Sequence, residues 1–146
     1  MKLANTVANT YGSRNPFTIC EELGIEILFL HLDDGLRGSI NRIRGQYVVF
    51  IHDQLTEHVQ YYVCAHELGH FFFHRGLNCT LFDGEYSRSK YENKADIFAC
   101  QLLYGEPPLF DDPAMTYSQI ADCLQTKEDK VQDKLYEYGV YPFYEE

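Results

Sequence analysis

Apolar and polar residues follow two different periods along this chain. A helical period, bounded by Gly, Pro and capping residues, predicts six helices: Leu3–Tyr11, Phe17–Leu23, a long one that opens within Asp53–Glu57 and runs to about His74, Tyr91–Tyr104, Tyr117–Leu124 and Lys127–Tyr138. Short apolar runs predict three strands: Ile25–Leu30, Arg37–Ile43 and Gln46–Ile51, the last two forming a hairpin around Arg44-Gly45. Helices that flank a small antiparallel sheet are an α+β pattern.

Local signals mark the ends of these elements. Asn15 followed by Pro16 is typical of a helix N-cap and first helical position, and Gly24 is typical of a helix end. Thr116 with Gln119 resembles a capping box. The segment Asn78–Ser89 is rich in Gly, Ser and charged residues and is predicted to be a loop.

Chain length and composition favour one domain. The chain has 146 residues, of which 45% are hydrophobic, enough for a single core. We expect one domain over residues 1–146, with its core at about 10–105 and a helical C-terminal part at 106–146. The formal net charge of −10 argues against direct binding of nucleic acid. It suits a basic protein partner, or simply solubility.

The sequence shows no signal for export or membrane insertion. Residues 1–11 contain one Lys and no apolar core, so no signal peptide is expected. No run approaches the roughly 18 apolar residues that span a membrane. An odd number of cysteines without a Cys-x-x-Cys motif is typical of reduced core thiols in a cytoplasmic protein. The cysteines are Cys20, Cys64, Cys79, Cys100 and Cys123.

The most specific motif is His66-Glu67-Leu68-Gly69-His70. On a helix, positions i and i+4 share a face, so both imidazoles can bind one ion while Glu67 lies beside them. This pattern predicts a catalytic zinc site in which Glu67 is the general base. We expect one Zn²⁺ per chain, although manganese or iron would tolerate similar ligands.

A catalytic zinc site needs a third protein ligand. A later histidine in the pattern HExxHxxGxxH is excluded, because Phe73 and Gly76 occupy the Gly and His positions. His74 continues the i, i+4 series, but three rings spread over about 12 Å of helix do not converge on one ion. We expect His74 to pack near the helix end or to support the site.

Glu92 and Asp96 fit the alternative, in which a glutamate from a later helix completes the site. They lie one turn apart and share a helix face. Glu92 can bind the metal while Asp96 accepts the free N–H of one ligand histidine and fixes its tautomer. We expect that histidine to be His66, with His70 as the alternative. Glu85, in loop-like sequence, is the reserve ligand.

Two further roles have several candidates. An additional group should stabilise the oxyanion, and the candidates are Tyr86, Tyr91, Tyr104 and His74. The strand Tyr47–Ile51 directly precedes the motif helix. If it forms the sheet edge, Tyr47, Val49 and Ile51 would belong to a strand that binds an extended substrate; an ordinary core strand is the alternative.

Together these residues resemble the ImmA/IrrE family of metallopeptidases. The resemblance covers about residues 10–105 and rests on five segments: Arg14-Asn15-Pro16-Phe17, Ile19–Ile25, Leu36-Arg37-Gly38, Cys64–His70 with His74, and Glu92-x-x-Ala95-Asp96-x-Phe98-Ala99-x-x-Leu102-Leu103. Two positions depart from the family pattern. Asp96 replaces the more usual Asn, and Tyr104-Gly105 stands where Met-Pro is common.

The resemblance implies a small fold with a thermolysin-like zinc core, encoded by bacteria or phages and often by mobile elements. It implies that His66, His70 and Glu92 bind zinc and that Glu67 is the catalytic base. It also implies an endopeptidase that cleaves a helix-turn-helix repressor and so derepresses phage or mobile-element genes.

Two other hypotheses remain open. The chain would be a metal-stabilised regulatory protein that sequesters a repressor, or acts in a toxin–antitoxin-like pair, without hydrolysis. Alternatively, the zinc would be purely structural, in a closed shell with a fourth ligand such as His74 or Cys79. Glu67 favours the enzyme, because a structural site needs no base. The sequence does not indicate an oligomeric state.

Overall fold

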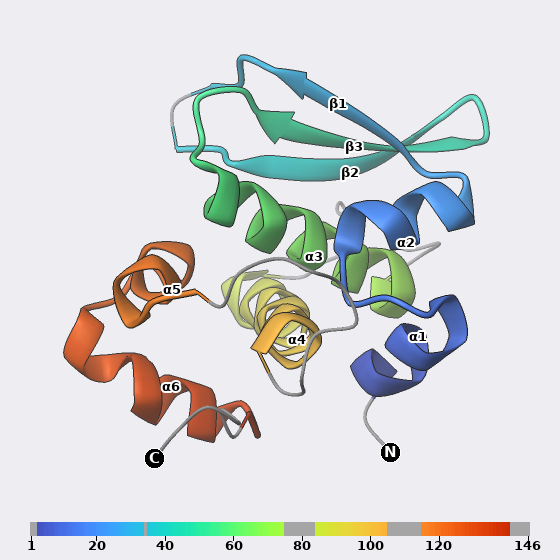
Figure 1. Ribbon diagram of the computed structural model, residues 1–146. Helices are drawn as coiled ribbons and strands as arrows, with labels where there is room; N and C mark the ends of the chain where they lie inside the picture. The colour runs from blue at the N-terminus through green and yellow to red at the C-terminus, as the bar shows by residue number, and fades with distance from the viewer. Residues whose placement is uncertain (1–2, 34, 75–83, 105–114, 141–146) are drawn as a thin grey trace.

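Helices pack against one face of a three-stranded sheet (Figure 1). The computed structural model describes residues 3–33, 35–74, 84–104 and 115–140. The elements are α1 (Leu3–Tyr11), α2 (Pro16–Leu23), β1 (Glu26–Leu30), β2 (Gly38–Ile43), β3 (Gln46–His52), α3 (Glu57–His74), α4 (Gly84–Tyr104), α5 (Tyr117–Leu124), the short 3-10 helix η2 (Glu128–Lys130) and α6 (Val131–Glu137). The α+β class expected from the sequence is confirmed.

The sheet has the strand order β1-β3-β2 and is mixed. β2 and β3 form the predicted antiparallel hairpin, in which Arg44 and Gly45 both have positive φ, as a tight hairpin turn requires. β1 pairs with the other side of β3 and runs parallel to it. The expectation of an antiparallel sheet is therefore wrong for β1. The direction in which β1 pairs with β3 is set by contacts distant in sequence, which a local pattern does not reveal.

β3 is the central strand and not an edge. It pairs with β1 on one side and with β2 on the other, so its backbone cannot accept a third, extended chain. Val49 and Ile51 are fully buried, and Tyr47 packs edge-on against Phe71 of α3 with ring centroids 5.0 Å apart. The expectation that Tyr47, Val49 and Ile51 belong to a substrate-binding edge is wrong.

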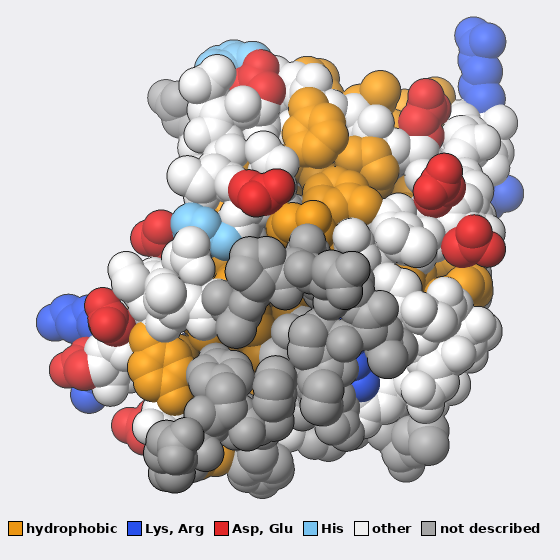
Figure 2. Space-filling model, in the orientation of Figure 1, with side chains coloured by type: hydrophobic (Ala, Val, Ile, Leu, Met, Phe, Trp, Pro, Cys, Tyr) orange, Lys and Arg blue, Asp and Glu red, His pale blue; other side chains and the backbone are white. Residues whose placement is uncertain are grey.

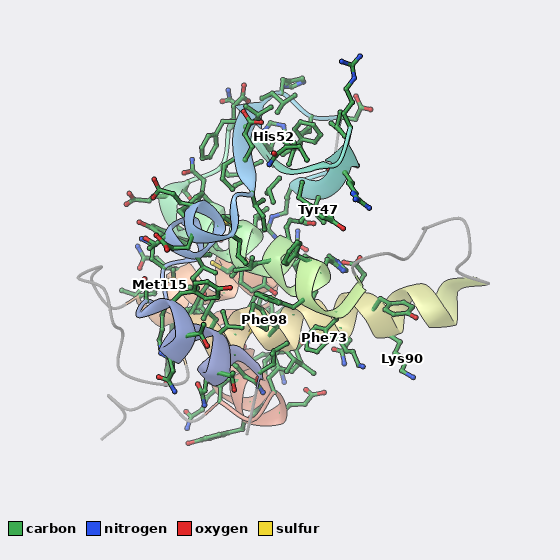
Figure 3. The ribbon with its side chains drawn as sticks, turned by 90° about the vertical axis from the view of Figure 1, so that its right-hand side faces the viewer. Tyr47, His52, Phe73, Lys90, Phe98 and Met115 are labelled. Atoms are coloured by element: carbon green, nitrogen blue, oxygen red, sulfur yellow. The ribbon has the colours of Figure 1, made fainter. Side chains whose placement is uncertain are left out.

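The crossing of α3 and α4 forms the centre of the molecule (Figures 1 and 3). Gly69 of α3 lies at this crossing, where a Cβ atom would lie only 3.1 Å from Cα of Ala95 on α4. α4 begins at Gly84, earlier than the predicted start at Tyr91. The prediction missed this part of the helix because the first turns of α4 have no apolar period. These turns, around Lys90, extend beyond the other elements (Figure 3).

Arg14 links the N-terminal helices to the end of α4. Its buried guanidinium donates through Nη1 to the carbonyls of Gln101 and Leu102, each at 3.1 Å, and through Nη2 to Asn5 Oδ1 at 2.8 Å. A cation at the last carbonyls of a helix satisfies groups that have no intrahelical partner. Arg14 thereby fixes the helix that carries Glu92.

The predicted caps of α2 and α5 are confirmed. Asn15 Oδ1 accepts the N–H of Phe17, and Gly24 ends α2 in the left-handed conformation. Thr116 and Gln119 form a reciprocal capping box. The described cysteines, Cys20, Cys64, Cys100 and Cys123, are buried free thiols, as expected, and Cys79 lies outside the described residues. Among the described helices, none combines the length and the hydropathy of a membrane span.

Candidate metal centre

His66, His70 and Glu92 come together where α3 crosses α4. Nε2 of His66 lies 3.0 Å from Glu92 Oε1, and Nε2 of His70 lies 3.1 Å from Glu92 Oε2. One potential donor atom of each side chain lies within 4.8 Å of the other two. The three residues predicted as ligands therefore form one cluster, which neither helix could form alone.

The cluster has the chemistry and spacing of a zinc site. Zinc–nitrogen and zinc–oxygen bonds of roughly 2.0–2.2 Å in a tetrahedron separate neighbouring ligands by about 3.3 Å, close to the distances found here. Zinc accepts two imidazoles together with a carboxylate, whereas magnesium and calcium prefer oxygen ligands and seldom bind imidazole. The side chains fit the metal implied by the motif, and three ligands leave a position for water or substrate.

The protonation of the cluster also favours a cation. Burial lowers the pKa of His66, but hydrogen bonds to Asp96 and Glu92 outweigh burial and raise that pKa to about 10. Hydrogen bonds from His66 and His70 hold the pKa of Glu92 well below its usual range. The carboxylates thus stabilise positive charge between the two helices. A bound divalent cation would provide this positive charge in place of the protons on the histidines.

Asp96 orients His66. Its Oδ1 lies 2.8 Å from His66 Nδ1, on the side of the ring away from Glu92, so Nδ1–H can donate to Asp96 while Nε2 faces the cluster. The hydroxyl of Tyr62 donates to the same oxygen, and burial raises the pKa of Tyr62. Tyr62 was missed in the sequence, although it precedes His66 by one helical turn.

Glu67 is buried beside this cluster. Burial raises its pKa, while the charges of His66 and His70 oppose the increase. A carboxyl with a raised pKa is suited to accept and return a proton near neutral pH. Gly38 at the start of β2 lies against α3 at this point: a Cβ there would collide with Val63 and lie 3.8 Å from Glu67 Cγ.

A cleft of about 280 Å³ opens onto these residues. α3 and α4 contribute His66, Glu67 and Glu92 on one side, and the start of β2 contributes Gly38. The opposite wall comes from α5, α6 and the residues that follow each, namely Cys123, Leu124, Gln125, Lys134 and Tyr138. Arg37 Nη1 donates to the Cys123 carbonyl at 3.3 Å and connects the two walls. No local pattern in the sequence indicates that the C-terminal helices reach the site.

Among the other predicted candidates, the described residues Tyr91 and Tyr104 are not part of the cluster or the cleft lining. Tyr104 is buried at the far end of α4, where its hydroxyl contacts Met115 Sδ at 3.4 Å. Tyr91 precedes Glu92 but is not among the described residues that line the cleft. The side chains of His74, Glu85 and Tyr86 lie outside the described part of the structure.

Comparison with known proteins agrees with this geometry. Residues 20–112 match the family model of the IrrE N-terminal-like domain, a peptidase family. The chain is 33% identical to Metallopeptidase ImmA of Bacillus subtilis (strain 168) over 118 residues, which cover 78% of this chain and 67% of that protein. It is 27% identical to immunity region protein 2 of Bacillus phage phi105 over 95 residues, which cover 64% of this chain and 60% of the phage protein. The chain therefore belongs to the ImmA/IrrE family of metallopeptidases.

Proposed function

We propose that this chain is a zinc-dependent endopeptidase that cleaves a helix-turn-helix transcriptional repressor and so derepresses phage or mobile-element genes. The observation that carries the proposal is Glu67: a buried carboxyl with a raised pKa directly beside the His66–His70–Glu92 cluster. A purely structural metal site needs no such group.

His66, His70 and Glu92 would hold the zinc, with Asp96 and Tyr62 fixing the orientation of His66. When bound, zinc supplies a Lewis acid for the scissile carbonyl and lowers the pKa of water. Glu67 takes the proton of the attacking water and delivers it to the leaving amine, so one carboxylate serves as base and then as acid. Burial raises the pKa of Glu67, which makes the carboxylate a stronger base for the proton of the water.

β2 is an edge strand among the described residues, and its outer side suits an extended substrate. The N–H of His52 donates to the carbonyl of Arg37, which makes these two residues a hydrogen-bonded pair. By alternation Ser39 faces β3, while the N–H and C=O groups of Gly38 and Ile40 face outward. Gly38 also lines the cleft. We infer that the substrate backbone pairs there, next to Glu67.

The proposed substrate class rests on relatives and charge. One relative is an immunity region protein of a phage, and the family resemblance implies a helix-turn-helix repressor as the substrate. The net charge of −10 suits a basic partner, and DNA-binding domains are basic. The proposed setting is the cytoplasm of a bacterium, where such repressors act.

The decisive experiment compares the wild-type chain with Glu67→Gln and Glu92→Ala. Each zinc-loaded protein is incubated with the purified helix-turn-helix repressor encoded nearest to its gene, and the products are analysed by mass spectrometry. We expect the wild type to cut the repressor at one site. Glu67→Gln should keep the zinc of the cleft without cutting, and Glu92→Ala should lose the zinc of the cleft and the activity together.

One result would favour a different function. If the wild type binds the repressor with zinc in place but never cuts it, the chain acts by sequestration, as a metal-stabilised regulatory protein. Cleavage by Glu67→Gln at the wild-type rate would remove Glu67 from the chemistry and refute the proposed mechanism.

A further inference from the structure

A second group of potential metal ligands lies at the ends of two parallel strands. His31 follows β1, and His52 and Asp53 lie at the end of β3. One potential donor atom from each of the three side chains lies within 4.8 Å of the other two. The rings of His31 and His52 meet edge to face with centroids 5.1 Å apart. No local pattern in the sequence links these residues, since 20 positions separate the two histidines.

This group is separate from the cleft. Ile51 is fully buried towards the helices, so the pleat of β3 directs the next side chain, His52, to the opposite face of the sheet. Figure 3 shows His52 at the top of the molecule, well away from Phe73 and Phe98 at the crossing of α3 and α4. The sheet thus stands between this group and His66.

The backbone fixes the three residues relative to one another. The N–H of Asp53 donates to the carbonyl of Leu30 at 3.1 Å, directly before His31, and the N–H of His52 donates to the carbonyl of Arg37 at 2.9 Å. Strand pairing already holds the backbone of these residues in place, so binding a metal costs little further conformational entropy of the backbone.

Nδ1 of His52 is the atom placed to bind a cation with Asp53. It lies 3.6 Å from Asp53 Oδ1, near the spacing of about 3.3 Å between neighbouring zinc ligands. Nδ1 now accepts the N–H of Gln54 at 3.1 Å, so a metal would displace that hydrogen bond. Gln54 is exposed, and water can accept its N–H instead.

We propose that His31, His52 and Asp53 form a second site for zinc or a similar transition-metal cation. Two imidazoles and a carboxylate favour such cations over magnesium and calcium, and the acidic chain attracts them. Because His31 is exposed whereas His66 and His70 are half-buried, we expect this site to fill after the first as the zinc concentration is raised. The proposed hydrolysis in the cleft does not use this site.

The metal at this site connects the end of β1 to β3. β1 is an edge strand whose Leu28, Phe29 and Leu30 are 43%, 49% and 37% exposed. Figure 2 shows apolar side chains gathered on the face where β1 lies towards the viewer. An edge strand with this much apolar surface is prone to open and to pair with other chains. A cation that binds only the folded strands stabilises the closed state.

The test is the zinc stoichiometry of the full chain. Protein freed of metal is dialysed against buffers of increasing zinc concentration, and bound zinc is measured by plasma mass spectrometry. We expect two zinc ions per wild-type chain, one in His31→Ala/His52→Ala and one in His66→Ala/His70→Ala. Asp53→Asn should also lose the second ion. His58→Ala, a histidine outside both clusters, is the matched control and should keep two.

Each outcome decides the proposal. One zinc per wild-type chain, retained in His31→Ala/His52→Ala, would overturn the second site and leave the cleft site intact. Two zinc ions retained in that variant would also overturn it. If the single wild-type ion is lost in His31→Ala/His52→Ala and kept in His66→Ala/His70→Ala, the second site stands and the proposed zinc hydrolase fails. Circular dichroism of each variant checks folding, and Asp53→Asn provides the milder substitution.

Discussion

Oδ1 of Asp96 lies 2.8 Å from Nδ1 of His66, while Oε1 of Glu92 lies 3.0 Å from Nε2 of the same ring. The imidazole is thus held between two carboxylates that are one turn apart on α4. One of them can fix the tautomer and the other can share a metal ion with the ring. The position of α4 therefore determines which nitrogen of His66 faces the metal cluster and in which direction that nitrogen points.

Replacing Asp96 tests this arrangement. Asp96→Ala should lower zinc affinity by about 10- to 100-fold, as is typical when the partner of a ligand histidine is removed. Asp96→Asn should lose much less, since its amide oxygen can accept the same Nδ1–H. Competition titration with a chromophoric chelator measures both. Equal losses for Asn and Ala would show that the charge of Asp96 matters more than its hydrogen bond.

Gly69→Ala tests the closeness of α3 and α4. Alanine is normally better than glycine inside a helix by about 1 kcal/mol. Here the added Cβ would lie 3.1 Å from Ala95 Cα and 3.3 Å from Phe98 Cβ, and overpacking of this kind costs about 1–3 kcal/mol. We expect lower stability in urea denaturation together with weaker zinc binding, because α4 carries Glu92. A more stable variant with unchanged zinc affinity would contradict this account.

Stability of the metal-free protein should depend on His66. Its pKa is about 10 when folded and about 6.5 when unfolded, so the native state binds more protons between these values. The stabilisation is complete below pH 6.5 and is lost as the pH rises through 10. The lowered pKa of Glu92 acts oppositely: its contribution is present above the ordinary range and lost in acid. Melting temperatures between pH 6 and 10 should fall more steeply for the wild type than for His66→Ala. Zinc binding should follow the reverse trend, because it requires an unprotonated imidazole.

Lys134 on α6 should contribute to substrate binding. It lines the cleft, its Nζ lies 5.5 Å from the Tyr138 ring centroid, and no carboxylate among the described residues pairs with it. Losing one hydrogen bond to a charged group costs roughly 1.5 kcal/mol, so Lys134→Ala should lower kcat/KM about tenfold, mainly through KM. Zinc content should not change. Lys130→Ala, an exposed lysine on η2, is the control, and equal activity of both variants would exclude this role.

Local features of the chain were readable from its sequence. Helix caps at Asn15 and Thr116 and the i, i+4 pair His66 and His70 depend on neighbours within a turn, which a single sequence displays directly. Glu92 was predicted together with Asp96 because the two lie one helical turn apart, and Glu92 contacts both histidines. What depended on distant contacts was missed: the central position of β3, the parallel pairing of β1 and the C-terminal wall of the cleft. No local period encodes which strand becomes an edge.

The C-terminal wall of the cleft has a consequence for how this family diversifies. The proposed ligands and base lie on α3 and α4, within residues 20–112, whereas Lys134 and Tyr138 lie beyond that range. Mutations in the last two helices can therefore accumulate without touching the proposed ligands or base. A chimera of this chain that carries the last two helices of a relative should acquire the target preference of that relative. It should keep the proposed metal ligands and catalytic base of this chain.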